Sequence, residues 1–285
     1  MTVSEPGISP TVWSGGPEPE LARQLWSALT NRLSCWRPDW EDAITAEKAP
    51  QAPTAYRFAQ MSEEAVFKAF AIAAISGNTR WDRIASIEHD LDHPFQGFSP
   101  GRFAALPDRE ISEHIVPWFR QRRAGSARLP SVLSRLKDTA RILGCDEART
   151  STAFLSEVLL EAHHSPEQAA VLIGTPSTYK LPGFGIALAA EALRLLGLDV
   201  CKPDRHVLRA IASWRIVRFN KWPEGQFAAP DARPEESLAT MLAVRRIATM
   251  NAVSVSYATS VIWLAGAVSG ARLSNEDLAR IWLPA

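Results

Sequence analysis

Cysteine is scarce in this chain of 285 residues, and the three cysteines that occur are widely separated. Cys35, Cys145 and Cys201 form neither a CxxC pair nor the spacing of a zinc or iron–sulfur site. Metal centres and disulfide frameworks that depend on such patterns are therefore excluded. An odd number of distant cysteines is typical of a reducing compartment, so we expect a cytoplasmic protein.

Long hydrophobic runs are also missing. The two most apolar stretches, residues 65–75 and 257–267, fall well short of 18 residues, and the first contains Lys68. We therefore expect no membrane-spanning helix and no membrane partner. Residues 1–10 contain Glu5 and two prolines but no apolar run, so we also expect no secretory signal.

The chain has no excess of charge of either sign. Its 31 Lys and Arg residues balance 31 Asp and Glu residues, which excludes a global attraction to polyanions but not a local basic face. Hydrophobic residues at 46% and charged residues at 22% exclude a largely disordered chain.

The hydrophobic pattern predicts an all-α fold of about ten helices joined by short loops, because apolar residues recur at helical spacing and no β-hairpin signal occurs. Ser62 is a predicted N-cap and Gly144 a predicted C-cap, and the proline-rich stretch 92–107 is a predicted loop. The predicted helices are 20–33, 62–76, 79–91, 108–123, 130–143, 150–162, 166–173, 186–196, 205–214, 234–249, 256–269 and 274–281.

The sharpest local motif is the hexapeptide K-L-P-G-F-G at residues 180–185, directly before the helix that begins at Ile186. Gly183 and Gly185 allow a tight turn with positive φ and leave backbone N–H groups accessible at the helix start, where an anion can bind. Leu181 and Phe184 would anchor the turn to the core. Taken alone, the hexapeptide is equally compatible with an ordinary connection between two helices.

A second motif follows at a defined distance. The apolar helix 186–196 ends at Gly197, and Asp204 lies 19 residues beyond Gly185 in the segment P-D-R-H-V. Together, residues 179–210 resemble the helix-hairpin-helix DNA glycosylase superfamily, whose pattern is an L-P-G-x-G hairpin, an apolar helix and an Asp-bearing V-D-x-H-V segment. Residues 74–79 resemble a helix end of that family, with Asn78 as a wedge that fills the gap left by an extruded base. The Gly-Asn pair is also an ordinary helix stop.

The resemblance implies two helical lobes with the hairpin at the cleft between them. One lobe would be residues 65–200, and the other would combine residues 1–64 with 201–285. It also implies hydrolysis of the N-glycosidic bond of a damaged or mismatched base in base excision repair. Asp204 would stabilise an oxocarbenium-like transition state and orient the attacking water. The alternative is that Asp204 only caps its helix.

The resemblance bears on a second activity too. Family members that cut the DNA backbone carry a lysine two residues after the second hairpin glycine, and here that residue is Ala187. A monofunctional glycosylase is therefore favoured. Lys180 and Lys202 leave a bifunctional lyase open, although either is equally a phosphate contact or a solvated charge. Ala187 and the lack of an iron–sulfur motif favour alkylated bases as substrates without identifying the lesion.

The expected partner is double-stranded DNA with a damaged base, bound by a monomer that associates with the nucleoid if the source is prokaryotic. The hairpin is expected to hold Na⁺ or K⁺, with no other cofactor and no metal site built from side chains. Seven basic residues between Arg120 and Arg141 form either a phosphate-facing patch or a solvated helix face. A non-enzymatic DNA-binding protein with the same hairpin is the alternative. The expected DNA contacts are Asn78, Lys180, Leu181, Gly183, Phe184, Gly185, Ala187, Lys202 and Arg205.

Overall fold

The computed structural model describes residues 17–50, 61–77, 79, 81–144, 150–267 and 271–282, and within these ranges it is helical with no β-strand. The predicted all-α fold is confirmed. The chain divides into two compact units, residues 1–50 with 205–285, and residues 51–204. The lobes expected from the sequence place these boundaries at 64/65 and 200/201.

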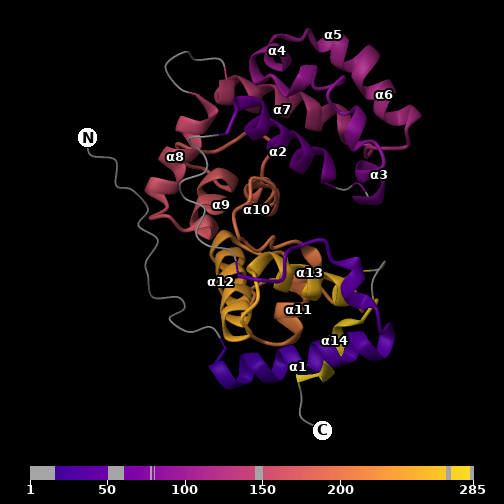
Figure 1. The fold of residues 1–285 in the computed structure, drawn as a ribbon, viewed down its shortest axis with the longest axis vertical. Coiled ribbons are helices and arrows are strands. Elements are labelled where there is room, and N and C mark those ends of the chain that lie inside the picture. Colours follow the sequence, from indigo (N-terminus) through magenta and orange to yellow (C-terminus); the bar gives the residue numbers. More distant parts are fainter. Residues whose placement is uncertain are drawn as a thin grey trace. The chain divides into compact units, whose positions relative to one another are not determined.

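The unit of residues 51–204 is built around α2 (Glu63–Ser76), shown in Figure 1. Ser62 caps this helix as predicted, accepting a hydrogen bond from the Ala65 N–H at 3.2 Å. From Val66 to Ile75 every residue except Lys68 is buried, which is the pattern of a central helix surrounded by others.

Helix α2 contacts α7 (Leu129–Gly144), α8 (Ser151–Glu161) and α10 (Ile186–Leu195), and the last of these follows the hairpin directly. A π-helical turn (η5, Ile111–Ile115) joins α5 to α6, and 3₁₀ turns lie at Glu88–Asp90 (η3) and Gln96–Phe98 (η4). The helices of this unit after α2 are α3 (Trp81–Ala85), α4 (Pro100–Ala105), α5 (Asp108–Glu110), α6 (Val116–Gln121), α7 (Leu129–Gly144), α8 (Ser151–Glu161), α9 (Pro166–Gly174) and α10 (Ile186–Leu195).

The other unit joins segments from the two ends of the sequence. Helix α1 (Pro19–Trp36) buries Ala22, Leu25, Leu29 and Leu33, which lie on one face at helical spacing. That helix contacts α12, α13 and α14, and Figure 1 shows indigo α1 beside yellow α14. The remaining elements are η1 (Trp40–Ala43), α11 (Arg205–Ser213), α12 (Pro234–Met250), α13 (Val255–Gly266) and α14 (Asn275–Trp282).

Three predictions about local structure are wrong. The predicted loop 92–107 contains α4, which starts at Pro100 behind a Ser99 cap; proline is favoured at the first helical position because the missing N–H has no partner there. Gly144 is not a cap but the last residue of α7, where a Cβ would lie 2.4 Å from Pro100 Cγ of α4. Its small size therefore serves the contact between two helices. The predicted helix 79–91 is reduced to α3 and a 3₁₀ turn.

Among the described residues, no single helix has both the length and the apolarity to cross a membrane. Only α12 and α13 taken together reach that length and composition, across a bend of 108°.

Candidate functional site

The hexapeptide at residues 180–185 forms a tight hairpin between α9 and α10. The Leu181 N–H donates a hydrogen bond to Ile173 O, and the Phe184 N–H donates one to Leu181 O, both at 3.2 Å. Gly183 adopts φ +82°, a left-handed conformation that favours glycine. The side chains of Leu181 and Phe184 are 0% and 2% exposed, so the predicted anchoring of the turn to the core is confirmed.

Three glycines set how closely the hairpin elements approach one another. A Cβ at Gly174 would lie 2.5 Å from the backbone nitrogen of Ile186, so the end of α9 touches the start of α10. A Cβ at Gly183 would lie 3.0 Å from Arg135 Cβ on α7. At Gly185, the N-cap of α10, the space around a built Cβ is empty to 4 Å, and both Gly183 and Gly185 are exposed. The backbone at the start of α10 is thus open to a ligand.

Two side chains form hydrogen bonds to the hairpin backbone, one from α7 and one from the hairpin itself. Thr139 Oγ1 of α7 donates to Pro182 O at 2.9 Å. The Lys180 amino group donates to Gly174 O at 2.7 Å and also to Phe184 O. Burial lowers the pKa of Lys180. The Lys180 amino group is thus directed into the hairpin, and the expected phosphate contact by Lys180 stays a prediction.

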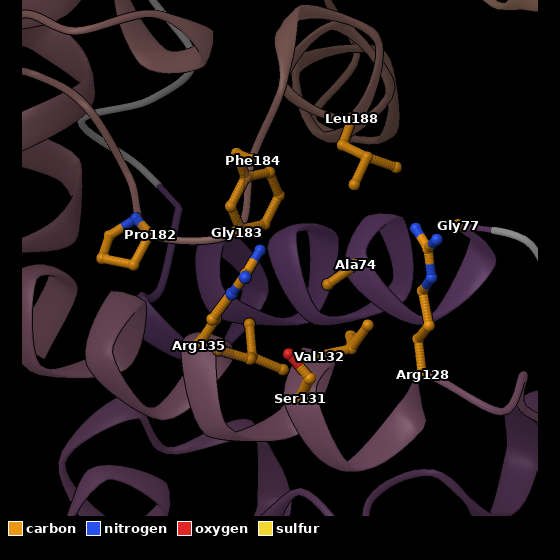
Figure 2. Close-up of a pocket in the computed structure, with 11 residues that line it drawn as sticks. Ala74, Gly77, Arg128, Ser131, Val132, Arg135, Pro182, Gly183, Phe184 and Leu188 are labelled. Carbon is orange, nitrogen blue, oxygen red and sulfur yellow. The ribbon is translucent and has the colours of Figure 1, made fainter.

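A pocket of about 390 Å³ opens beside the hairpin, between α7 and α10. Figure 2 shows the Arg128 and Arg135 side chains extending from the α7 side of the pocket toward Phe184 and Leu188. Both arginines are exposed, and neither forms an ion pair within the described part of the chain. Most of the other side chains that line the pocket are apolar, and they include Ala74, Val132, Leu136, Phe184 and Leu188. The pocket therefore combines two available guanidinium groups with an apolar surface.

The basic residues from Arg120 to Arg141 differ in their surroundings. Arg122 lies over the Trp118 ring at 4.0 Å. Lys137 is buried and donates to Asp108 at 2.7 Å, and Arg141 is bonded to Asp138. These three charges have partners within the protein, whereas Arg128 and Arg135 point into the pocket.

Asp204 lies in the segment that follows α10 and directly precedes α11. It is half-buried, and its backbone N–H donates to Lys202 O at 2.8 Å. Lys202 Nζ lies 3.8 Å from Glu191 Oε2 on α10. The segment that carries Asp204 is thus attached by an ion pair to the helix that the hairpin opens.

Glu191 is the centre of this attachment. It is 3% exposed and accepts two hydrogen bonds from Arg194, at 2.8 and 3.1 Å. Burial alone would raise the pKa of this carboxyl, but the Arg194 bonds and the Lys202 charge outweigh burial and lower it. Glu191 was not among the predicted site residues, although a carboxylate in the middle of a mostly apolar helix is a signal that the sequence contains.

The other expected site residues are placed as follows. Ala187 lies half-buried in the first turn of α10, next to the hairpin. Arg205 belongs to the other unit, where it is exposed and donates to His206 Nε2 at 3.2 Å. Arg209 of α11 is buried and bonded to the carbonyls of Gly266 and Leu273. Asn78, the expected wedge, lies outside the described residues.

The hairpin carbonyls of Leu181, Pro182, Phe184 and Gly185 each accept a hydrogen bond. The expected Na⁺ or K⁺ at the hairpin stays a prediction. Within the described ranges, no three His, Cys, Asp or Glu side chains gather into a metal site.

No protein-family model, curated protein or solved structure matches this chain.

Proposed function

We propose that this chain is a monofunctional DNA glycosylase that removes a damaged base in base excision repair. The observation that carries the proposal is that an exposed glycine hairpin and Asp204 are attached to the same helix, α10. The hairpin opens that helix, and the Lys202–Glu191 ion pair ties the Asp204 segment to it. A DNA-backbone clamp and a carboxylate held by one rigid element are what cleavage of a glycosidic bond requires.

Asp204 carries the chemistry in this proposal. As the base leaves, positive charge develops on the deoxyribose, and a carboxylate close to the sugar stabilises it. The same carboxylate orients a water molecule for attack at the anomeric carbon. The bond from the Asp204 N–H to Lys202 O restricts the backbone that aims the side chain.

The surroundings of the two candidate lysines support a hydrolase without lyase activity. Ala187 occupies the position of the family's nucleophilic lysine and has no amino group. Lys180 is bonded to two backbone carbonyls, and Lys202 pairs with buried Glu191. Both amino groups thus have partners within the protein, which supports the proposal of a hydrolase without lyase activity. Borohydride treatment during turnover is expected to trap no covalent protein–DNA adduct, and an adduct would establish lyase chemistry instead.

DNA is held, in this proposal, by the hairpin backbone together with Arg128 and Arg135. Backbone N–H groups at the start of α10 bind one phosphate, and the guanidinium groups in the neighbouring pocket bind phosphate on the same strand. Extruding the target base costs a few kcal/mol, which is smallest for damaged or mispaired bases. Alkylated bases are the substrate class we propose.

The deciding experiment is a base-release assay over duplexes that each carry one lesion, comparing the wild type with Asp204→Asn. We expect release from at least one duplex and a rate at least ~100-fold lower in the variant, because the amide carries no charge to stabilise the sugar cation. Glu224→Gln, which neutralises an exposed carboxylate elsewhere, is the matched control and should keep the wild-type rate. Equal release by wild type and Asp204→Asn would contradict the catalytic assignment.

The second candidate is a DNA-binding protein without enzymatic activity. The exposed hairpin and the arginine pocket support this function as well as they support a glycosylase, because both would bind DNA without catalysis by Asp204. Binding to duplex DNA with no base release from any lesion duplex would select this function.

A further inference from the structure

We propose that the Lys180 amino group is a built-in replacement for the monovalent cation that hairpins of this kind are expected to bind. The inference concerns the architecture of the hairpin and holds whether or not the chain is a glycosylase. It follows from the position of Lys180 Nζ between two backbone carbonyls that belong to different elements.

Those two carbonyls lie at the junction that a cation would have to bridge. Gly174 O is at the last residue of α9, where carbonyls lack intrahelical partners and the helix dipole is negative. Phe184 O belongs to the hairpin, one residue before the N-cap of α10. A positive charge between them joins the end of one helix to the start of the next, and a bound metal ion would perform the same task.

A metal ion and the lysine would compete for the same carbonyls. An ion that joined the end of α9 to the start of α10 at this junction would bind Gly174 O and Phe184 O, to which the Lys180 amino group already donates. Two positive charges on one carbonyl repel each other. The lysine and the metal ion are therefore alternatives.

The consequence is that the hairpin should be independent of the cation in solution. Lys180 is covalently part of the chain, so its charge is present at every salt composition. A chain that depends on dissolved Na⁺ or K⁺ to order this turn would instead lose stability when only a large cation is supplied.

The experiment measures the thermal midpoint, Tm, in KCl, NaCl and tetramethylammonium chloride at equal ionic strength. We expect the wild type to have the same Tm in all three salts. Lys180→Ala removes the amino group and leaves space for an ion, so its Tm should fall by ~5 °C in tetramethylammonium chloride and partly recover in KCl or NaCl. Lys221→Ala, at an exposed residue of the other unit, is the control and should behave as the wild type.

Lys180→Met adds a second variant that fills the space with an apolar stem. Its Tm should be lowered equally in all three salts, because no cation can enter. Three results would overturn the proposal: a wild type stabilised by KCl or NaCl over tetramethylammonium chloride, a Lys180→Ala variant as stable as the wild type, or a Lys180→Ala variant whose lost stability no small cation restores. The wild-type comparison decides even if the variants do not fold.

The readout also separates this inference from the proposed function. Tm needs no DNA, so a failed base-release assay leaves the cation comparison intact. Conversely, a wild type that needs K⁺ for stability yet releases damaged bases would remove the role of Lys180 and leave the glycosylase proposal standing.

Discussion

Gly183 and Gly185 are two residues apart in the hairpin, yet the structure gives them different tasks. Two features require glycine at residue 183: its φ is +82°, and the stem of Arg135 occupies the space that a side chain would need. Gly185 has φ −95°, which any residue adopts, and open space where a side chain would project. Its lack of a side chain matters to a ligand rather than to the fold.

Exchanging each glycine for alanine should therefore separate folding from binding. We expect Gly183→Ala to lower the free energy of unfolding by ~1–3 kcal/mol, from backbone strain and the contact with Arg135. Gly185→Ala should change stability by less than ~1 kcal/mol but weaken duplex DNA binding, because a methyl group enters the space that a phosphate would occupy. Urea denaturation and fluorescence anisotropy measure the two effects. Equal losses of stability would contradict this division of roles.

At the scale of elements, α10 connects the two parts of the candidate site. Its first residue follows the hairpin, and Glu191 in its middle holds Lys202 of the Asp204 segment. A buried carboxylate with two cationic partners is costly to disturb, since removing one partner leaves the others without compensation.

Glu191→Gln should therefore lower the free energy of unfolding at pH 7 by ~2 kcal/mol. This is less than the ~3–5 kcal/mol of a fully buried pair, because the Arg194 and Lys202 side chains keep 28% and 24% of their surface exposed. Glu276→Gln, at a pair with Arg280 whose side chains are 73% and 67% exposed, is the control, with an expected loss below ~1 kcal/mol.

The pH dependence of Glu191→Gln has a definite sign. The folded-state pKa of Glu191 is lowered, so below the unfolded value of ~4.3 the unfolded chain binds more protons than the folded one. The stabilisation is complete above that pH and is lost as pH falls through the folded pKa. The difference between wild type and Glu191→Gln in urea denaturation should thus shrink from pH 6 toward pH 3, and a constant difference would contradict the account.

The sequence predicts those features that depend on neighbouring residues. The Ser62 cap and the anchoring by Leu181 and Phe184 follow from local spacing, and both are confirmed. Features that depend on distant partners were not predictable. Thr139 binds Pro182 across 43 residues, and Lys180 binds backbone carbonyls whose positions no side-chain pattern encodes. The same limit explains the wrong loop at 92–107, where the pattern alone does not distinguish a proline that starts a helix from one that ends it.

At the scale of the whole molecule, zero net charge means that affinity for DNA must come from a few placed cations. Arg141 and Arg109 are bonded to the carboxylates of Asp138 and Glu113, so their fields are partly cancelled. Arg128 and Arg135 line the pocket beside the hairpin and form no ion pair with any residue that the structure describes. Under the glycosylase proposal, these two arginines make most of the phosphate contacts that come from α7 and from the residue directly before it.

The salt dependence of DNA binding tests this assignment with matched charge changes. Each phosphate contact contributes ~0.9 to the slope of log affinity against log salt concentration, so Arg128→Ala with Arg135→Ala should make that slope less steep by ~1.8. Arg109→Ala with Arg141→Ala gives the same net charge of −2 but should leave the slope near the wild-type value. Fluorescence anisotropy on an undamaged duplex from 50 to 200 mM KCl measures the slopes of both double variants. Over this range of salt concentration, the affinity of a protein that contacts several phosphates changes strongly. If both double variants flatten the slope equally, binding depends on total charge, and the pocket has no special role.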